Sequence, residues 1–399
     1  MMTDTKEKAP NRATLSELLV GKRILLVVGS GGVGKTTTAA TLGLLAALRG
    51  RRVLVLTIDP ARRLADALGV SALRHECQEV PPERLSIVAS ERGETPVPGG
   101  LLHAMMLDQK RAFDDLVEKH AKDPAMLDRV LRNQIYQQIS SALAGSHEYA
   151  AMSRLYELSQ TDRYDLIVMD TPPTENAIDF LEAPEKVKKA VDSETIQWIM
   201  KPVLQQAGSL SWRLLGVGGA IVLRGLSRFV GSAFLTQVAE FFVEFQQVLG
   251  GFKERAQKVT ALLHKDDVSF VLTCSPESLS IDEALYFHER LLRYGLPFAG
   301  CVVNRVHREL PEEPKNLLAL LSARPELAGF GEDDLRELAR ALGLTYAEQR
   351  VLSQADATSI LRLSQKVGPP LCEIPLLEED VHDGRSLAHI SRYVVPPKA

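Results

Sequence analysis

A glycine-rich run between a buried strand and a helix is the feature that most constrains how this chain can fold. Residues 24–28 (ILLVV) are continuously apolar, as a parallel strand covered on both faces requires. Gly29–Thr36 (GSGGVGKT) follows and satisfies G-x-x-x-x-G-K-S/T, and an Ala- and Leu-rich stretch comes next. Strand, loop and helix in this order predict a phosphate-binding loop in an α/β domain.

The chemistry of such a loop assigns a role to each residue type. Glycines let successive backbone amides converge on phosphate oxygens, and the helix N-terminus adds partial positive charge. We expect Lys35 to reach the β- and γ-phosphates and Thr36 to give a hydroxyl to Mg²⁺. The candidate nucleotide-binding residues of this segment are Gly29, Ser30, Gly31, Gly32, Val33, Gly34, Lys35, Thr36 and Thr37.

Composition excludes several classes of protein. The chain has 399 residues, of which 45% are hydrophobic and 25% charged, as in a globular protein. Lys+Arg 47 against Asp+Glu 51 gives a net charge of -4, which disfavours a nucleic-acid partner. The longest apolar run, residues 214–223, has half of the roughly 20 residues that a membrane-spanning helix needs, so we expect no transmembrane segment. The polar N-terminus of the chain and its few cysteines predict a cytoplasmic protein.

Further apolar runs predict the rest of the sheet. Strong strand candidates are 52–58 (RVLVLTI), 164–170 (YDLIVMD), 268–274 (VSFVLTC) and 298–304 (FAGCVVN), with a short one at 85–88. Residues 101–160 show helical spacing instead. Alternating strands and helices predict an α/β fold with a doubly wound, mostly parallel sheet flanked by helices.

The sequence also suggests how the chain is organised. Residues 1–21 are expected to form a flexible tail, and 22–399 a single P-loop domain. That domain should include a helical insertion at about 184–262 and a second helical stretch at about 312–366. One apolar helix face of the insertion comprises Val238, Phe241, Phe242, Phe245, Val248 and Leu249.

Two acidic residues end predicted strands, where ligands bind in open α/β sheets. Asp59, in IDPAR, either orients the attacking water or the metal shell, or caps a helix starting near Pro60. Asp170 is the expected second-sphere Mg²⁺ holder, and a loop acid satisfied by its neighbours is the alternative. The turn Thr171–Thr174 that follows is suited to sensing the γ-phosphate.

GSGGVGKT, IDPAR and DTPPT together resemble the deviant Walker A ATPases, most closely their ArsA and tail-anchored-protein-targeting branch, over about 22–384. The resemblance implies Mg²⁺-dependent ATP hydrolysis by a nucleotide-gated homodimer coupled to client binding or transport, with membrane-protein targeting as one such role. An arsenite or other anion efflux subunit is the first alternative, and a MinD/ParA-like positioning ATPase the second. The implied partners are an apolar helical client or a membrane partner.

Family roles transfer onto named positions of this sequence. The resemblance makes Asp59 the residue that acts on the water, and Thr36, Asp59 and Asp170 the Mg²⁺ site. The family's adenine side falls on Glu277, Asn304 and the Pro375–Leu377 loop. From the residues alone, Glu277 could equally cap a helix and Asn304 could be a turn residue.

The sequence departs from the family at informative places. Ser30 stands where the family has a lysine that reaches the partner's nucleotide, and Arg62 or Arg63 is a candidate replacement. The four cysteines lack a Cys-x-x-Cys pair, which disfavours a zinc-clamped dimer and a metalloid site. The charge balance and the C-terminus, which lacks a basic amphipathic helix, disfavour the positioning alternative.

Overall fold

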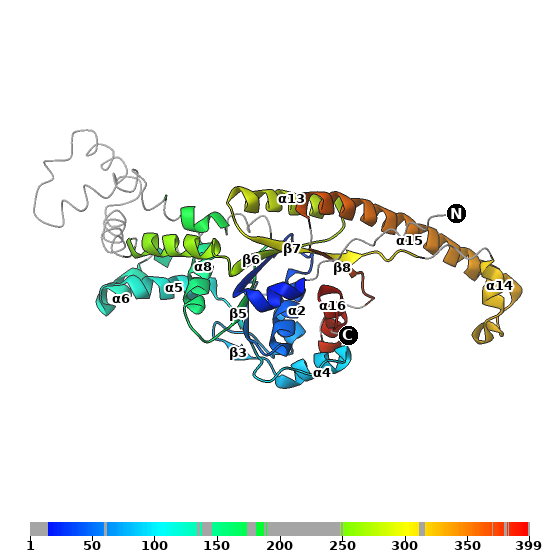
Figure 1. Cartoon of the computed structure of the whole chain (residues 1–399), viewed down its shortest axis with the longest axis horizontal. Helices are drawn as coiled ribbons and strands as arrows, with labels where there is room; N and C mark the ends of the chain where they lie inside the picture. The colour runs from blue at the N-terminus through cyan, green and yellow to red at the C-terminus, as the bar shows by residue number, and fades with distance from the viewer. Residues whose placement is uncertain are drawn as a thin grey trace, which may run out of the picture.

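The computed structural model describes residues 15–59, 62–133, 136–137, 146–173, 181–186, 189, 248, 250–310, 316–368, 370–378, 381 and 383–397. The predicted α/β fold is confirmed, because the described residues form an eight-stranded sheet with helices on both faces (Figure 1). Its strands are β1 (Ile24–Gly29), β2 (Arg52–Thr57), β3 (Gln78–Glu79), β4 (Leu101–Met106), β5 (Leu166–Asp170), β6 (Val268–Cys274), β7 (Phe298–Val306) and β8 (Leu371–Pro375).

Strand order places the glycine loop at the centre of the sheet. The spatial order is β3-β4-β2-β5-β1-β6-β7-β8, so β1 pairs in parallel with β5 on one side and β6 on the other. All strand pairs are parallel except that of β3 with β4. The carboxyl ends of the central strands therefore meet at one edge, where open α/β sheets bind ligands.

Alternate residues of β1 point to different cores, which is why its sequence is apolar throughout. Leu25 and Val27 lie in one buried cluster, and Ile24, Leu26 and Val28 lie in the other. The helices that contribute to the first cluster are α1 (Leu18–Gly21), α2 (Lys35–Leu48), α3 (Arg63–Leu68), α4 (Pro82–Arg92) and α16 (Gly384–Val394). Those of the second include α5 (Gln109–His120), α6 (Pro124–Arg132), α8 (Ser146–Ser159), α13 (Ser278–Arg293), α15 (Glu332–Val367) and the helical residues 250–263.

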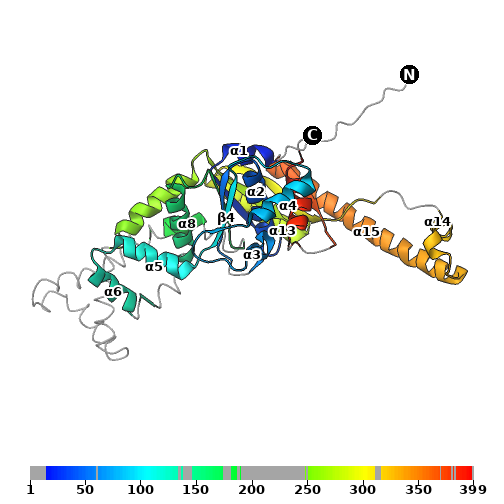
Figure 2. The same cartoon turned by 90° about the horizontal axis from the view of Figure 1, so that it is seen from below.

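A helical arm extends away from the sheet, as Figures 1 and 2 show. It consists of α14 (Leu317–Ser322), a 3-10 turn at Pro325–Leu327 and the N-terminal half of α15. The C-terminal half of α15 buries Ile360, Leu363 and Val367 in the core. Within the described ranges, no helix is both long and apolar enough to cross a membrane.

Three local expectations were wrong. Residues 85–88 lie in α4, which starts at Pro82 and ends before Gly93, whose left-handed conformation is a typical helix stop. Residues 101–106 form β4, whose sequence LLHAMM has no β-branched residue and is held in place by pairing with β2. Leu15 and Leu19 are fully buried, so residues 15–21 pack on the domain and are not part of a tail.

The expected insertion at about 184–262 is described only in part. Residues 250–263 are helical, and Phe252, Ala256 and Val259 on this helix are buried in the core. The Tyr149 hydroxyl donates a 2.7 Å hydrogen bond to the Phe252 carbonyl. The predicted apolar face lies outside the described residues except for Val248, which is fully buried.

Candidate functional site

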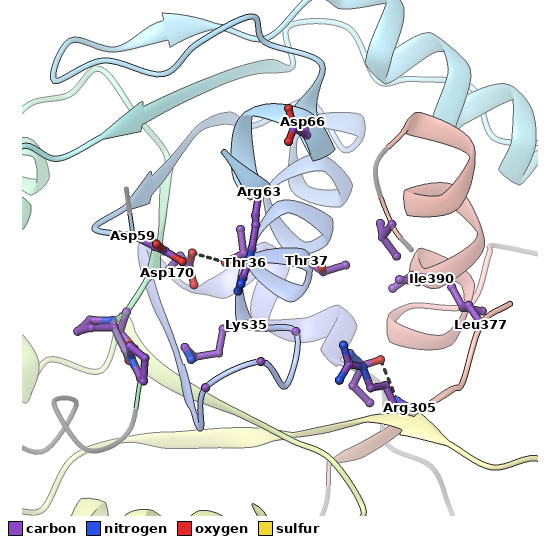
Figure 3. Close-up of a pocket in the computed structure, with 18 of the residues that line it drawn as sticks. Lys35, Thr36, Thr37, Asp59, Arg63, Asp66, Asp170, Arg305, Leu377 and Ile390 are labelled. Carbon is purple, nitrogen blue, oxygen red and sulfur yellow. Dashed lines mark hydrogen bonds between the residues drawn. The ribbon is translucent and has the colours of Figure 1, made fainter. Parts of the chain in front are cut away.

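A cavity of about 510 Å³ opens at the carboxyl ends of the central strands (Figure 3). The predicted site residues that line it are Gly31, Gly32, Gly34, Lys35, Thr36, Thr37, Asp59, Asp170, Thr171, Asn304 and Pro375. Four predicted residues, Gly29, Ser30, Val33 and Glu277, are not among its lining residues. The fold thus brings together predicted site residues that are spread along the sequence from Gly31 to Pro375.

The phosphate loop needs glycine where it meets β7. Gly34 has φ +97, in the left-handed region, and it precedes the first turn of α2. A Cβ on Gly34 would lie 2.3 Å from the Asn304 Nδ2 atom. Both the backbone conformation and the close approach exclude other residues. The N-terminus of α2 consequently opens on the cavity, where its amides favour an anion.

Lys35 lies in the cavity wall with its ammonium group facing two acids. Its Nζ donates a 2.6 Å hydrogen bond to the Ser30 carbonyl. Burial lowers the pKa of Lys35, and the nearby Asp170 and Asp59 carboxylates oppose that shift by favouring the charged form. A buried ammonium group at a helix N-terminus is a strong binder for phosphate oxygens.

Asp170 connects the phosphate loop to β2. Its Oδ2 accepts hydrogen bonds from Thr36 Oγ1 (2.7 Å) and Thr57 Oγ1 (2.9 Å). Its Oδ1 is buried and has no hydrogen-bond partner among the described residues. Burial raises the pKa of Asp170 to about 6, although the two threonine hydroxyls and Lys35 favour the carboxylate.

These donors fit a magnesium ion. The unpaired oxygen of Asp170 and the hydroxyl of Thr36 are hard oxygen ligands of the kind that Mg²⁺ prefers. Mg²⁺ takes few ligands from protein, because water and phosphate oxygens fill its other positions. The described residues contain no cluster of three or more His, Cys, Asp or Glu side chains that could hold a metal alone. The site therefore suits Mg²⁺ that arrives with a nucleotide.

Asp59 lines the cavity next to Asp170, and Figure 3 shows the two carboxylates on the same side. Its backbone N–H donates to Thr57 Oγ1 at 3.1 Å, and the same hydroxyl donates to Asp170. The helix after Asp59 starts only at Arg63, with Arg62 at its N-cap position. Asp59 is therefore not the N-cap residue of α3, and it lies in the cavity wall.

Thr171 lines the cavity, and its hydroxyl and backbone N–H are hydrogen-bonded to the sheet. Its backbone N–H and its Oγ1 both donate to the Val27 carbonyl, at 3.2 Å and 2.9 Å, and the residue is buried. Thr171 thus fixes the end of β5 against β1. Thr174, at the far end of the predicted sensing turn, lies outside the described residues.

The other end of the cavity has an apolar wall. Asn304 Nδ2 donates to the Val33 carbonyl at 3.0 Å, so this predicted adenine residue also joins β7 to the phosphate loop. Apolar lining comes from Pro375, Leu376, Leu377, Val381 and Ile390. Glu277 stands at the N-cap position of α13, but its side chain makes no capping hydrogen bond.

Ser30, which stands in place of the family's lysine, and its candidate replacements Arg62 and Arg63 differ in their surroundings. The Ser30 hydroxyl donates to the Glu283 carboxylate on α13, so this position connects the loop to a helix. Arg63 lines the cavity, whereas Arg62 is not among its lining residues.

Sequence reasoning missed the lining residues Asp66, Arg305, Val381 and Ile390. Only Arg305 had a signal, because it follows Asn304 directly.

We predict that Asp170→Asn stabilises the metal-free protein at pH 8. The raised pKa of Asp170 means that its contribution to stability is full below about pH 3.8 and is lost as pH rises through about 6. Removing the buried charge should add about 1–3 kcal/mol to the free energy of unfolding at pH 8, and less at pH 5. Urea denaturation in EDTA measures this, with exposed Asp66→Asn as the control. A less stable Asp170→Asn protein at pH 8 would contradict the prediction.

Comparisons with known proteins agree with this geometry. The chain is 26% identical over 286 residues to ATPase GET3 of Chaetomium globosum, covering 71% of this chain and 73% of the relative. It is 24% identical over 377 residues to ATPase get3 of Neurospora crassa, covering 94% and 91%. ATPase GET3 of Malassezia globosa is 22% identical over 414 residues, covering 100% and 98%. The family described as anion-transporting ATPase (ArsA) matches residues 22–329, more than half of the chain, and the protein therefore belongs to this ATPase family.

Proposed function

We propose that this ATPase hydrolyses ATP with Mg²⁺ as a cytoplasmic homodimer, and that its nucleotide state controls the binding of an apolar helical client. The observation that carries the catalytic part is the cavity in which Lys35, Asp59 and Asp170 converge. The sequence resemblance to tail-anchored-protein-targeting ATPases favours membrane-protein targeting as the work that hydrolysis drives.

Each residue has a chemical role in this proposal. Lys35 and the amides of the glycine loop bind the β- and γ-phosphates at the N-terminus of α2. Thr36 and the free oxygen of Asp170 hold Mg²⁺, which when bound neutralises charge on the phosphate oxygens. Asp59 orients the attacking water and favours its deprotonation from the same side of the cavity.

Two contacts support transmission of the nucleotide state to the helices. Ser30 in the loop is hydrogen-bonded to Glu283 of α13. The neighbouring Asp282 forms a 2.8 Å ion pair with Arg362 of α15. A loop that rearranges around the γ-phosphate therefore acts on α13 directly and on α15 through it, as switching proteins do.

Exposed apolar side chains on the arm support a client or partner. Among the described residues, large exposed hydrophobic side chains occur on α14, on α15 and between them: Leu320, Phe330, Leu338, Leu342, Leu344, Val351 and Leu352. Clusters of this kind are typical of interaction surfaces. The apolar helix face in the insertion, at residues 238–249, is either a second client surface or part of a permanent core. Only its residue Val248 is described, and that side chain is fully buried.

Anion efflux is the second candidate, favoured by the description of the matched family. A soft metalloid would need accessible thiolates. Cys274, Cys301 and Cys372 are all buried. The pKa of the Cys301 thiol is raised, first by its hydrogen bond with Cys274 and second by its burial. Efflux of a metalloid held by these thiols is therefore the weaker proposal, and a positioning role has no supporting observation in the described structure.

We predict that Asp59→Asn lowers steady-state ATP turnover at least about 100-fold while ATP affinity stays within about threefold. The carboxylate acts on the water and not on the phosphates. Lys35→Ala, in contrast, should lose both activity and binding, because its ammonium group contacts the phosphates. Phosphate release and calorimetric titration measure the two effects. Parent-like turnover by Asp59→Asn would exclude its catalytic role.

Arg63 is the stronger candidate for the missing cation. It makes no ion pair with any described residue, and its charge acts on Lys35. Figure 3 shows it extending from α3 toward Thr36. We predict that Arg63→Ala lowers turnover at saturating ATP by about tenfold or more, since a cation at the γ-phosphate can contribute up to 10³-fold or beyond. The adjacent Arg62→Ala is the matched control, and a loss under threefold in both would refute this role.

The gating proposal predicts a nucleotide-dependent change in both mass and helix protection. In the Asp59→Asn protein, ATP but not ADP should give a dimer by sedimentation and slow hydrogen exchange in α13 and α15. Glu283→Ala should keep ATP binding but reduce the change in α13, because the contact to Ser30 is lost. A monomer with identical exchange in both nucleotides would refute gating and leave the ATPase activity unaffected.

A further inference from the structure

Arg305 has an unusual backbone conformation at the mouth of the cavity. Its φ of +63 is the only positive value among the described residues other than glycine. The pairing of β7 with β8 shifts register between Val303 and Val306, so Asn304 and Arg305 lie in an irregular segment of the strand. Such irregularities re-aim side chains next to active sites, and left-handed non-glycine residues persist there when the surroundings hold them.

Hydrogen bonds hold this conformation against the phosphate loop. The Arg305 backbone N–H donates to Asn304 Oδ1 at 3.0 Å. Asn304 Nδ2 donates in turn to the Val33 carbonyl, also at 3.0 Å. The position of Arg305 is therefore fixed relative to the loop that binds phosphate, which is what a residue that orients another part of the same ligand requires.

The surroundings of the Arg305 side chain suit a flat ring rather than a phosphate. Arg305 lines the cavity together with the apolar residues Leu377 and Ile390. Figure 3 places these three residues on the side away from Asp59 and Asp170. The Arg305 guanidinium makes no hydrogen bond or ion pair with any described residue. Arg305 is exposed, and a planar, weakly hydrated cation that lines the same cavity as apolar side chains favours stacking on an aromatic system.

We propose that Arg305 is the base-positioning residue of this site: its guanidinium stacks on the purine ring of the nucleotide, opposite the wall formed by Leu377 and Ile390. This deepens the proposed function by naming how the same site holds the base. Stacking depends on ring size and not on the hydrogen-bonding edge, so Arg305 distinguishes purine from pyrimidine nucleotides and contributes equally to adenine and guanine.

The test compares ligands that share phosphates and differ in the base. Calorimetry would give the affinities of the full-length protein for ADP, GDP, CDP and inorganic tripolyphosphate. For Arg305→Ala we expect about tenfold weaker ADP and GDP binding, a loss under about threefold for CDP, and unchanged tripolyphosphate binding. Arg308→Ala is the control, because Arg308 is exposed and donates to the Tyr393 hydroxyl at 3.2 Å.

A second variant separates the side chain from the backbone. Arg305→Gly accommodates positive φ and should lose as much purine affinity as Arg305→Ala. A loss in the alanine variant alone would assign the effect to backbone conformation and overturn the proposal. So would equal losses for tripolyphosphate, which indicate a phosphate contact, or no loss at all. A parent protein that binds neither ADP nor ATP would instead refute the proposed function.

Discussion

The buried carboxylate of Asp170 is the contact on which the phosphate end of the site depends. One oxygen accepts hydrogen bonds from Thr36 at the start of α2 and Thr57 at the end of β2, so it joins two segments at the edge of the sheet. Its other oxygen has no partner among the described residues. Burial destabilises the charged form of Asp170, and the nearby ammonium group of Lys35 offsets only part of this effect. A nucleotide with a divalent cation would satisfy the rest.

The same loop is connected to two other parts of the molecule. Asn304 on β7 donates a hydrogen bond to the Val33 carbonyl, and Glu283 on α13 accepts one from the Ser30 hydroxyl. A serine in place of the family's lysine is thus a structural connection to α13. Because α13 is bound in turn to α15 through Arg362, the phosphate loop and the extended arm belong to one continuous network of packed helices.

The apolar end of the cavity, where we propose that the base binds, is built largely by the last part of the chain. Ile390 comes from α16, which packs against α4 through the buried side chain of Arg92. That guanidinium donates to Ser391 Oγ at 2.8 Å and to the Val395 carbonyl at 3.0 Å, while Glu94 balances its charge. Because this buried arginine is fully paired, it holds α16 against α4, and α16 in turn positions Ile390 in the cavity wall. Segments about 360 residues apart in sequence thereby form one pocket.

The sequence by itself determined the phosphate loop, the strands that carry Asp59 and Asp170, and the α/β class, because these depend on local patterns: glycine spacing, apolar runs and acids at strand ends. Local patterns could not decide that residues 101–106 form a strand, since LLHAMM becomes one only by pairing with β2. Nor could they show that Asp59 is not the cap of α3 or that Ser30 meets Glu283. At the apolar end of the cavity the family resemblance already indicated Asn304 and the Pro375–Leu377 loop. Arg305, Val381 and Ile390 came only from the tertiary structure, because this end takes its shape where distant strands and helices pack together.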